Sequence, residues 1–325
     1  EESEKIIDRF VDLGGNFIDT ANLYTKGHSE KIIGDHVGRD PKKRDRLVIA
    51  TKFSANHFPG DPNGGGSSRK SIIAACEQSL RRLQTEYIDL YWLHNWDKHT
   101  PIEETMQALH DLVQSGKVRY VGVSDTPAWK TTQAQMIAQF RGWSPFVGLQ
   151  IEYSLLERTV EGELIPMGIE LGMGVTPWSP LRGGVLSGKH TRDNAGKPGV
   201  TRRASTANYL NEKTFLLLDE LAHVARALDT SVARVALSWV QNRPGVTSTI
   251  IGARTLPHLN DNLAALDLTL TAEQTAKLDE LTTPTLNFPA RFLPAAGAIQ
   301  NGGTSVNGER SDASPWGVTK KDDHY

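Results

Sequence analysis

The sequence has a single cysteine, Cys76, among 325 residues. One thiol cannot build a disulfide framework within the chain, and cysteine-based zinc or iron–sulfur sites need several thiols. No charge sign dominates either, because 36 Lys and Arg face 38 Asp and Glu, a net charge of −2. This balance argues against a nucleic-acid partner, since phosphate binding requires a basic face.

Long apolar runs are also absent. No stretch approaches the roughly 20 residues that cross a bilayer, and the first residues show no signal-peptide pattern. We therefore expect a cytoplasmic protein without a membrane partner. A chain of this length buries enough surface to fold without disulfides or a structural metal.

Short apolar runs alternate with segments of helical periodicity. Strands are predicted over Asn16–Thr20, Leu47–Lys52, Ile88–His94, Arg119–Ser124, Val147–Tyr153, Gly174–Trp178 and Thr249–Gly252. Helices are predicted over Glu2–Leu13, Ser29–Val37, Arg69–Leu83, Ile102–Gln114, Ala128–Gln139, Gly162–Leu171, Glu212–Leu228 and Val232–Asn242. This alternation is typical of a parallel sheet with outer helices, either open or closed. Polar residues at successive strand ends favour the (β/α)8 TIM barrel, whose active site lies there.

The strand count falls short of a closed barrel. The seven predicted strands would leave two unpaired edges. We expect that a first strand is missing before residue 1, or that another segment closes the gap. One barrel domain over residues 1–283 is expected to carry the catalytic and cofactor sites. Residues 284–325, rich in Pro, Gly, Ala, Ser and Asn, predict a C-terminal loop or tail near the barrel mouth.

Four polar residues at or just after strand ends form the candidate catalytic group: Asp19, Tyr24, Lys52 and His94. A free phenol has a pKa of about 10, and a nearby ammonium lowers the pKa of a phenol. A carboxylate beside the ammonium keeps it charged. Such a tyrosine can donate a proton to a developing alkoxide, and a neutral histidine can orient the carbonyl.

Each of these residues alone has an ordinary structural explanation. Asp19 suits a turn cap, Lys52 an ion-paired surface lysine, His94 a hydrogen-bonded structural histidine and Tyr24 a packing aromatic. Their shared placement at neighbouring strand ends favours a catalytic group.

Seven motifs resemble the aldo-keto reductases, in family order over about residues 1–283. They are FIDTANLYTKGHSEKIIG, LVIATK, DLYWLHNWD, KVRYVGVSD, LQIEYSLLER, TPWSPLRGGVLSGK and STIIGARTLPHLNDNLAALDLTLT. The resemblance implies a (β/α)8 barrel that binds NADPH (NADP+) and interconverts a small-molecule carbonyl and an alcohol. It implies that Tyr24 is the general acid/base, that Lys52 and Asp19 tune it, and that His94 orients the carbonyl.

The resemblance also implies a cofactor site. Ser124, Asp125 and Gln150 match the residues that hold the nicotinamide carboxamide, and Trp178 matches the aromatic on which the nicotinamide stacks. Near the pyrophosphate and ribose the matches are Ser179, Leu181 and Gly183. At the adenosine end they are Gly252, Arg254, His258, Asp261 and Asn262. Arg254 is the residue expected to select NADPH, because its fork can grip a 2′-phosphate.

The sequence departs from the family pattern in several places. Asp125 stands where Asn is usual, and a carboxylate can only accept hydrogen bonds. Thr25 and Lys26 follow Tyr24 in place of the usual glycine, so the loop is expected to differ. The first family strand, with its Gly-rich end, is absent, from which we expect a truncated or processed N-terminus.

Other segments are open to two interpretations. His57, Phe58, Trp96, Trp129 and residues 287–293 suit a pocket for an aryl, terpenoid or sugar-like carbonyl, or plain packing. The loop Leu186–Tyr209, with Arg192, Lys197, Arg202 and Arg203, suits a clamp over the pyrophosphate or a solvated surface.

Two other functions remain open from the sequence. One is a Schiff-base aldolase that uses Lys52 as its nucleophile. The other is a redox-sensing subunit of a membrane channel, as some relatives of this family are.

Overall fold

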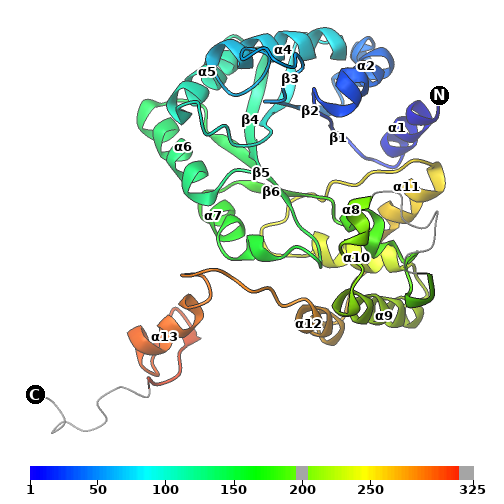
Figure 1. The fold of residues 1–325 in the computed structure, drawn as a ribbon, viewed down its shortest axis with the longest axis vertical. Helices are drawn as coiled ribbons and strands as arrows, with labels where there is room; N and C mark the ends of the chain where they lie inside the picture. The colour runs from blue at the N-terminus through cyan, green and yellow to red at the C-terminus, as the bar shows by residue number, and fades with distance from the viewer. Residues whose placement is uncertain (195–203, 315–325) are drawn as a thin grey trace, which may run out of the picture.

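A curled parallel sheet forms the centre of the protein (Figure 1). The structure, a computed structural model, describes residues 1–194 and 204–314. Six strands pair in chain order: β1 (Phe17–Asp19), β2 (Val48–Phe53), β3 (Ile88–Leu93), β4 (Val118–Ser124), β5 (Phe146–Glu152) and β6 (Gly174–Trp178). Most of their residues are buried, as expected for strands covered on both faces.

Helices between the strands cover the outside of this sheet (Figure 1). The first half of the chain contributes α1 (Glu2–Asp12), η1 (Tyr24–Gly27), α2 (His28–Ile33), η2 (Gly34–Gly38), α3 (Pro41–Arg44), α4 (Arg69–Leu83), α5 (Ile102–Gln114), α6 (Ala128–Arg141), η3 (Thr159–Glu161) and α7 (Leu164–Glu170). The predicted bounds of α4 and α5 are confirmed. The helix predicted over Ser29–Val37 is instead divided into α2 and η2, and the Ser29 hydroxyl bonds Thr20 Oγ1 at 2.7 Å.

The chain after β6 completes the ring mostly with helices. These are η4 (Arg182–Ser187), η5 (Arg192–Asn194), α8 (Ala204–Ala207), α9 (Glu212–Ala227), α10 (Val232–Gln241), α11 (Leu256–Leu263), η6 (Ala264–Asp267) and α12 (Ala272–Leu281). The arrangement is that of a (β/α)8 barrel whose first strand is not part of this sequence, as predicted. None of the helices in the described ranges is both long and apolar enough to span a lipid bilayer.

The strand predicted over Thr249–Gly252 is wrong. Residues 245–250 do follow β6: Val246 forms an isolated bridge with Val175, and the backbone N–H groups of Thr247 and Ile250 bond to β6 carbonyls, each at 2.9 Å. Pro177 in β6 has no N–H to donate in return. The ladder is therefore interrupted before a regular strand forms.

Inside the curled sheet, a tryptophan fills the space below the strand ends. Trp92 on β3 is fully buried and packs with Ala50 and Leu90. A Cβ on Gly122 would lie 2.4 Å from the Trp92 ring, and one on Gly148 would lie 2.8 Å from it. β4 and β5 therefore each need a glycine to accommodate this ring, which lies in the interior of the sheet two residues before His94.

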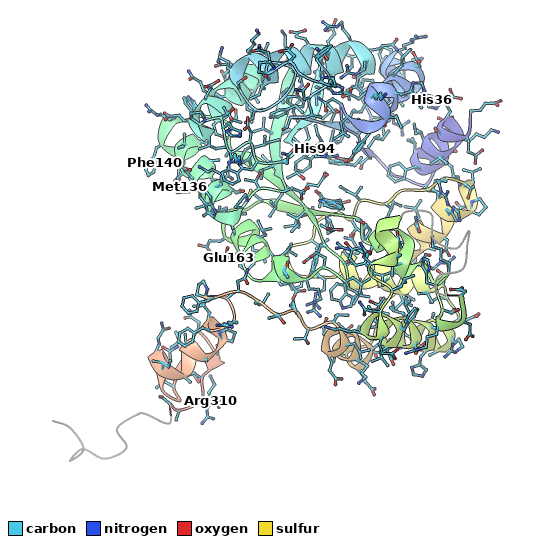
Figure 2. All side chains as sticks on the ribbon, in the orientation of Figure 1. His36, His94, Met136, Phe140, Glu163 and Arg310 are labelled. Atoms are coloured by element: carbon cyan, nitrogen blue, oxygen red, sulfur yellow. The ribbon has the colours of Figure 1, made fainter. Side chains whose placement is uncertain are left out.

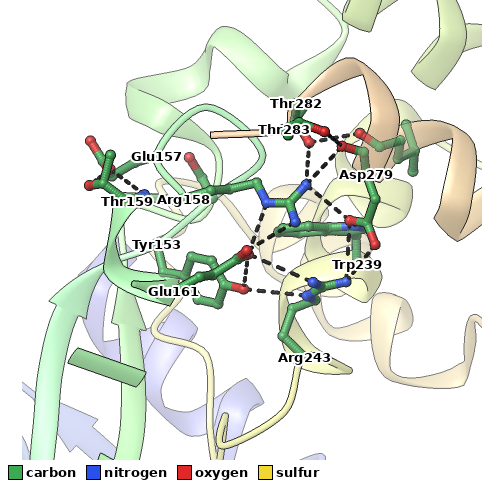
Figure 3. Close-up of polar contacts among 12 residues, drawn as sticks. Tyr153, Glu157, Arg158, Thr159, Glu161, Trp239, Arg243, Asp279, Thr282 and Thr283 are labelled. Carbon is green, nitrogen blue, oxygen red and sulfur yellow. Dashed lines mark hydrogen bonds and ion pairs between the residues drawn. The ribbon is translucent and has the colours of Figure 1, made fainter. Parts of the chain in front are cut away.

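A polar network ties the loop after β5 to the C-terminal helices (Figure 3). Arg158 contacts Glu161 at 2.8 Å and Asp279 of α12 at 3.1 Å. Arg243, just after α10, reaches the same Asp279 at 2.9 Å. The indole of Trp239 donates to Asp279 at 3.1 Å and lies between the two guanidinium groups. These contacts hold the second half of the barrel against the first.

The described part of the C-terminal segment contains α13 (Leu293–Asn301) and a short hairpin of β7 (Ser305–Val306) and β8 (Glu309–Arg310). Together they lie apart from the barrel in Figure 1. The sequence predicted no helix there, although Pro294 suits a first helical turn. Leu286 and Ala290, before this helix, pack against Gly162 in the loop after β5.

Candidate active site

Lys52 joins two of the other predicted catalytic residues. Its ammonium forms an ion pair with Asp19 and donates to the Thr20 carbonyl at 2.9 Å and to the Tyr24 hydroxyl at 3.3 Å. Adjacent parallel strands bring them together, because Asp19 ends β1 and Lys52 lies near the end of β2.

This ion pair is buried. The Lys52 side chain is fully buried and that of Asp19 is 7% exposed. Burial raises the pKa of the Asp19 carboxyl, while the Lys52 ammonium and a 3.0 Å hydrogen bond from Gln150 Nε2 act in the opposite direction. Two donors on one buried carboxylate hold it in place, and the carboxylate compensates the buried ammonium.

His94 follows the last residue of β3 and lies beside the tyrosine. Its ring meets that of Tyr24 edge-on, with centroids 6.0 Å apart, and Figure 2 places it at the centre of the molecule. Burial and the Lys52 ammonium lower the pKa of His94 to about 4. Its Nδ1 atom is buried and has no hydrogen-bond partner among the described residues. His94 is therefore neutral at pH 7.

The turn that carries Tyr24 has an unusual backbone. Thr25 and Lys26 both have left-handed conformations, with φ of 47° and 58°, and Gly27 follows at 86°. Such values are disfavoured for residues other than glycine, and most of all for a β-branched threonine. The turn that follows Tyr24 is therefore strained at two residues other than glycine.

Asp125 and Trp178 form a pair at the ends of β4 and β6. The indole Nε1 of Trp178 donates to Asp125 Oδ1 at 3.0 Å. Desolvation raises the pKa of the Asp125 carboxyl, and this hydrogen bond acts in the opposite direction. Ser124 and Gln150 face each other in register on β4 and β5. A pocket of about 450 Å³ adjoins the pair, with apolar walls that include Ile151 and Leu164.

The segment after Trp178 is a tight loop. Ser179 and Gly183 have positive φ, and the N–H of Arg182 closes a turn on the Ser179 carbonyl at 2.8 Å. Lys189, which the sequence analysis did not single out, lies over this loop, since its ammonium is 3.1 Å from where a Cβ on Gly184 would be. A lysine directly after a glycine-rich segment was the signal for it.

The residues predicted at the adenosine end divide into two groups. Arg254 and His258 are exposed around the start of α11, and Arg254 has no ion-pair partner in the part of the chain that the structure describes. Asn262 instead supports the loop by donating to the Gly252 carbonyl at 3.4 Å. The Asp261 carboxylate is engaged by α10, since it pairs with Arg234 at 2.8 Å.

The structure describes only part of the basic loop over residues 186–209. Lys197, Arg202 and Arg203 lie outside the described residues. Arg192 pairs with Glu212 at 2.7 Å and also with Asp219, both associated with α9. Its charge is therefore balanced by carboxylates of the chain itself.

Two of the aromatic residues predicted to line a pocket or to pack contact each other. The rings of Trp96 and Trp129 meet edge-on at 5.5 Å, and Lys130 lies 4.7 Å from the Trp129 centroid. Phe58 and Trp129 are more than half exposed. His57 is less exposed, and burial lowers its pKa.

The residues present fit a dinucleotide. Arg254 lies before α11 and has no ion pair among the described residues, which suits a phosphate. The turn at Gly183 and Gly184 permits close approach of a cofactor. The Trp178 indole, which bonds Asp125, offers a flat face.

Comparison with known proteins agrees with this geometry. A model of the "Aldo/keto reductase family" matches residues 1–283. The chain is 36% identical to a probable aryl-alcohol dehydrogenase, AAD4, of Saccharomyces cerevisiae, over 90% of this chain and 91% of the relative. It is 39% identical to the uncharacterized oxidoreductase YrpG of Bacillus subtilis, over 85% and 86%. It is 36% identical to an aryl-alcohol dehydrogenase [NADP(+)] of Phanerodontia chrysosporium, over 89% and 78%.

The family predicted from the motifs is thus confirmed. The match covers most of the chain, and the relatives match over most of their own lengths. This chain belongs to the aldo/keto reductase family, and it is an oxidoreductase of the kind that uses NAD(P)H.

Proposed function

We propose that the protein reduces an aldehyde or ketone to an alcohol with NADPH, and that Tyr24 is its general acid. The observation that carries this proposal is the buried Lys52 ammonium, which bonds both Asp19 and the Tyr24 hydroxyl. One residue thereby links a charge-compensating carboxylate to a phenol that is 39% exposed at the mouth.

The Tyr24 hydroxyl is the group that transfers the proton. As negative charge develops on the carbonyl oxygen, Tyr24 donates its proton, and Lys52 stabilises the phenolate that remains. Asp19 forms the ion pair that compensates the buried Lys52 ammonium. A neutral His94 with its proton on Nε2 donates to the same carbonyl oxygen and orients it. In the reverse direction the Tyr24 phenolate accepts the alcohol proton.

The dinucleotide is assigned to the positions matched from the family. When bound, its nicotinamide supplies the hydride. Ser124, Asp125 and Gln150 would hold the carboxamide, and Trp178 would offer its face to the ring. Asp125 can accept from the amide N–H₂ only, so this contact is one-sided. The remaining contacts are assigned to Ser179, Leu181, Gly183, Gly252, Arg254, His258, Asp261 and Asn262. Lys189, which lies over the turn at Gly184, is added from the structure.

Arg254 is proposed to select NADPH over NADH. It is exposed before α11 and has no ion pair within the described residues, so its guanidinium is available for a 2′-phosphate. We predict that Arg254→Ala raises the KM for NADPH about tenfold or more and leaves that for NADH nearly unchanged. Steady-state kinetics with both cofactors measure this, and equal changes in the two KM values would contradict it.

The substrate is proposed to carry an aromatic ring. Trp129 and Phe58 offer exposed aromatic surface, Trp96 packs edge-on against Trp129, and two relatives are named aryl-alcohol dehydrogenases. A barrel domain over residues 1–283 would hold the chemistry. Of the C-terminal segment, Leu286 and Ala290 would border the mouth at the loop after β5, whereas α13 and the hairpin lie apart from the barrel. We place the protein in the cytoplasm on the sequence grounds given above.

The test is a spectrophotometric panel. NADPH absorbance is followed with aryl aldehydes, aliphatic aldehydes, ketones, terpenoid carbonyls and keto-sugars. We expect turnover with the aryl compounds to have the highest kcat/KM. Absence of NADPH oxidation across all classes would contradict the function, and a preference for keto-sugars would contradict only the aromatic assignment. A Schiff-base role for Lys52 is disfavoured, because its amine is fully buried and bonded to Asp19, the Thr20 carbonyl and the Tyr24 hydroxyl.

A further inference from the structure

Arg182 lies between Leu181 and Gly183, two residues assigned to the dinucleotide site. Its side chain is only 10% exposed. The guanidinium forms an ion pair with Glu152 and donates from Nη2 to the Tyr209 hydroxyl at 2.7 Å. It also stacks 4.3 Å from the centroid of the Tyr209 ring. One side chain of the cofactor loop is thus held from two sides.

The backbone at Arg182 explains why such contacts are needed. Its φ is 47°, a left-handed value that L-residues disfavour, and Ser179 three residues earlier has a φ of 55°. The loop therefore does not have its intrinsically preferred shape. The contacts of the Arg182 side chain offset this strain and hold the loop in one conformation.

Glu152 and Tyr209 connect this loop to other parts of the molecule. Glu152 is the last residue of β5 and stands in register with Trp178 on β6. Tyr209 precedes α9. Desolvation raises the pKa of Glu152, and Arg182 acts in the opposite direction. Because this ion pair is largely shielded from water, it is stronger than an exposed pair at the same separation.

We propose that Arg182, held by Glu152 and Tyr209, is a positioning residue that preorganises the Ser179–Gly183 loop for the dinucleotide. A loop already in its bound shape loses less conformational freedom on binding, so the gain is in cofactor affinity rather than in the rate of chemistry. This inference rests on the proposed function. It assigns the Arg182 side chain no contact with the cofactor.

The test uses two conservative variants of the full chain. Glu152→Gln removes the charge of the pair, and Tyr209→Phe removes one hydrogen bond while keeping the ring. NADPH binding is followed by fluorescence titration without substrate. We expect Kd to rise about tenfold for Glu152→Gln and about threefold for Tyr209→Phe. The KM for NADPH should rise in parallel, with kcat nearly unchanged.

A matched control is Glu103→Gln, which removes the exposed pair between Glu103 and Arg141. Its Kd should equal that of the wild type. If Glu152→Gln lowers the melting temperature but leaves the Kd for NADPH unchanged, Arg182 only supports the fold and the inference is overturned. Wild-type protein that binds no NADPH would contradict the proposed function and the inference with it.

Discussion

The imidazole of His94 lies close to the Lys52 ammonium, and this neighbour, together with burial, determines its charge. The two effects lower the pKa of His94 to about 4. A neutral ring can orient a carbonyl without competing with Tyr24 as a proton donor. In the proposed mechanism Lys52 therefore stabilises the charge on Tyr24, and the neutral His94 orients the carbonyl.

The lowered pKa of His94 predicts an acid-dependent loss of stability. In the unfolded chain His94 returns to its ordinary value of 6.5. As the pH falls below that value, the unfolded state binds a proton that the folded state does not. The contribution is complete above about pH 6.5 and is lost as the pH falls to about 4.

We predict that, between pH 7 and pH 5, the wild type loses on the order of 1 kcal/mol more unfolding free energy than His94→Asn. Urea unfolding of both proteins at each pH measures this difference. Other titrating groups contribute equally to the two proteins, so parallel losses would show that His94 is not held neutral.

Among the elements, the turn η1 is the most strained part of the site. Thr25 has a left-handed backbone, with φ of 47° and ψ of 40°. We predict that Thr25→Gly stabilises the protein by about 0.5–1 kcal/mol, because relief of this strain exceeds the entropy that glycine adds to the unfolded chain.

Thr132→Gly within α6 is the control for this substitution. Thr132 is in a right-handed helix, where glycine costs about 1 kcal/mol. Denaturant midpoints of the two variants should therefore move in opposite directions. A loss of stability for Thr25→Gly would mean that the observed turn is not strained.

The sequence predicted those elements whose pattern is set locally. The buried runs that became β2 to β6 and the amphipathic helices α4 and α5 have clear apolar periodicity. The division of the helix after Tyr24 and the failure of the strand at Thr249 were not predictable in this way. The division of the helix lies at Ile33 and Gly34, where no periodic signal marks it. The failure of the strand depends on its pairing partner β6, where Pro177 has no N–H to donate.

The candidate site likewise contains residues that the sequence located and contacts that only the structure shows. Asp19, Lys52 and His94 could be found because strand ends of a parallel sheet meet at one edge. The glycine-rich segment before Lys189 marks that lysine as a candidate, but the contacts that Lys189 and Arg182 make could not be predicted, because they depend on left-handed turns at Arg182 and Gly184. Those turns have no periodic signal in the sequence.

For the whole molecule, the network around Asp279 joins the two halves of the barrel (Figure 3). The side chain of Arg158 is 7% exposed and contacts both Glu161 and Asp279. We predict that Arg158→Met lowers the free energy of unfolding by about 3 kcal/mol, because the partly buried carboxylates of Glu161 and Asp279 lose one of their two cationic partners and keep only Arg243.

Arg141→Met serves as the comparison, since it removes an exposed pair with Glu103 and should cost less than about 1 kcal/mol. Urea unfolding curves measure both values. Equal effects of the two substitutions would show that the network does not join the halves more strongly than a surface pair does.

The central claim is that Tyr24 transfers the proton, and Tyr24→Phe tests it most directly. The variant keeps the ring that lies against His94 and loses only the hydroxyl that Lys52 contacts at 3.3 Å. We predict that kcat falls about a thousandfold while the Kd for NADPH, measured by fluorescence, stays within about twofold of the wild type. Wild-type turnover in this variant would remove Tyr24 from the mechanism.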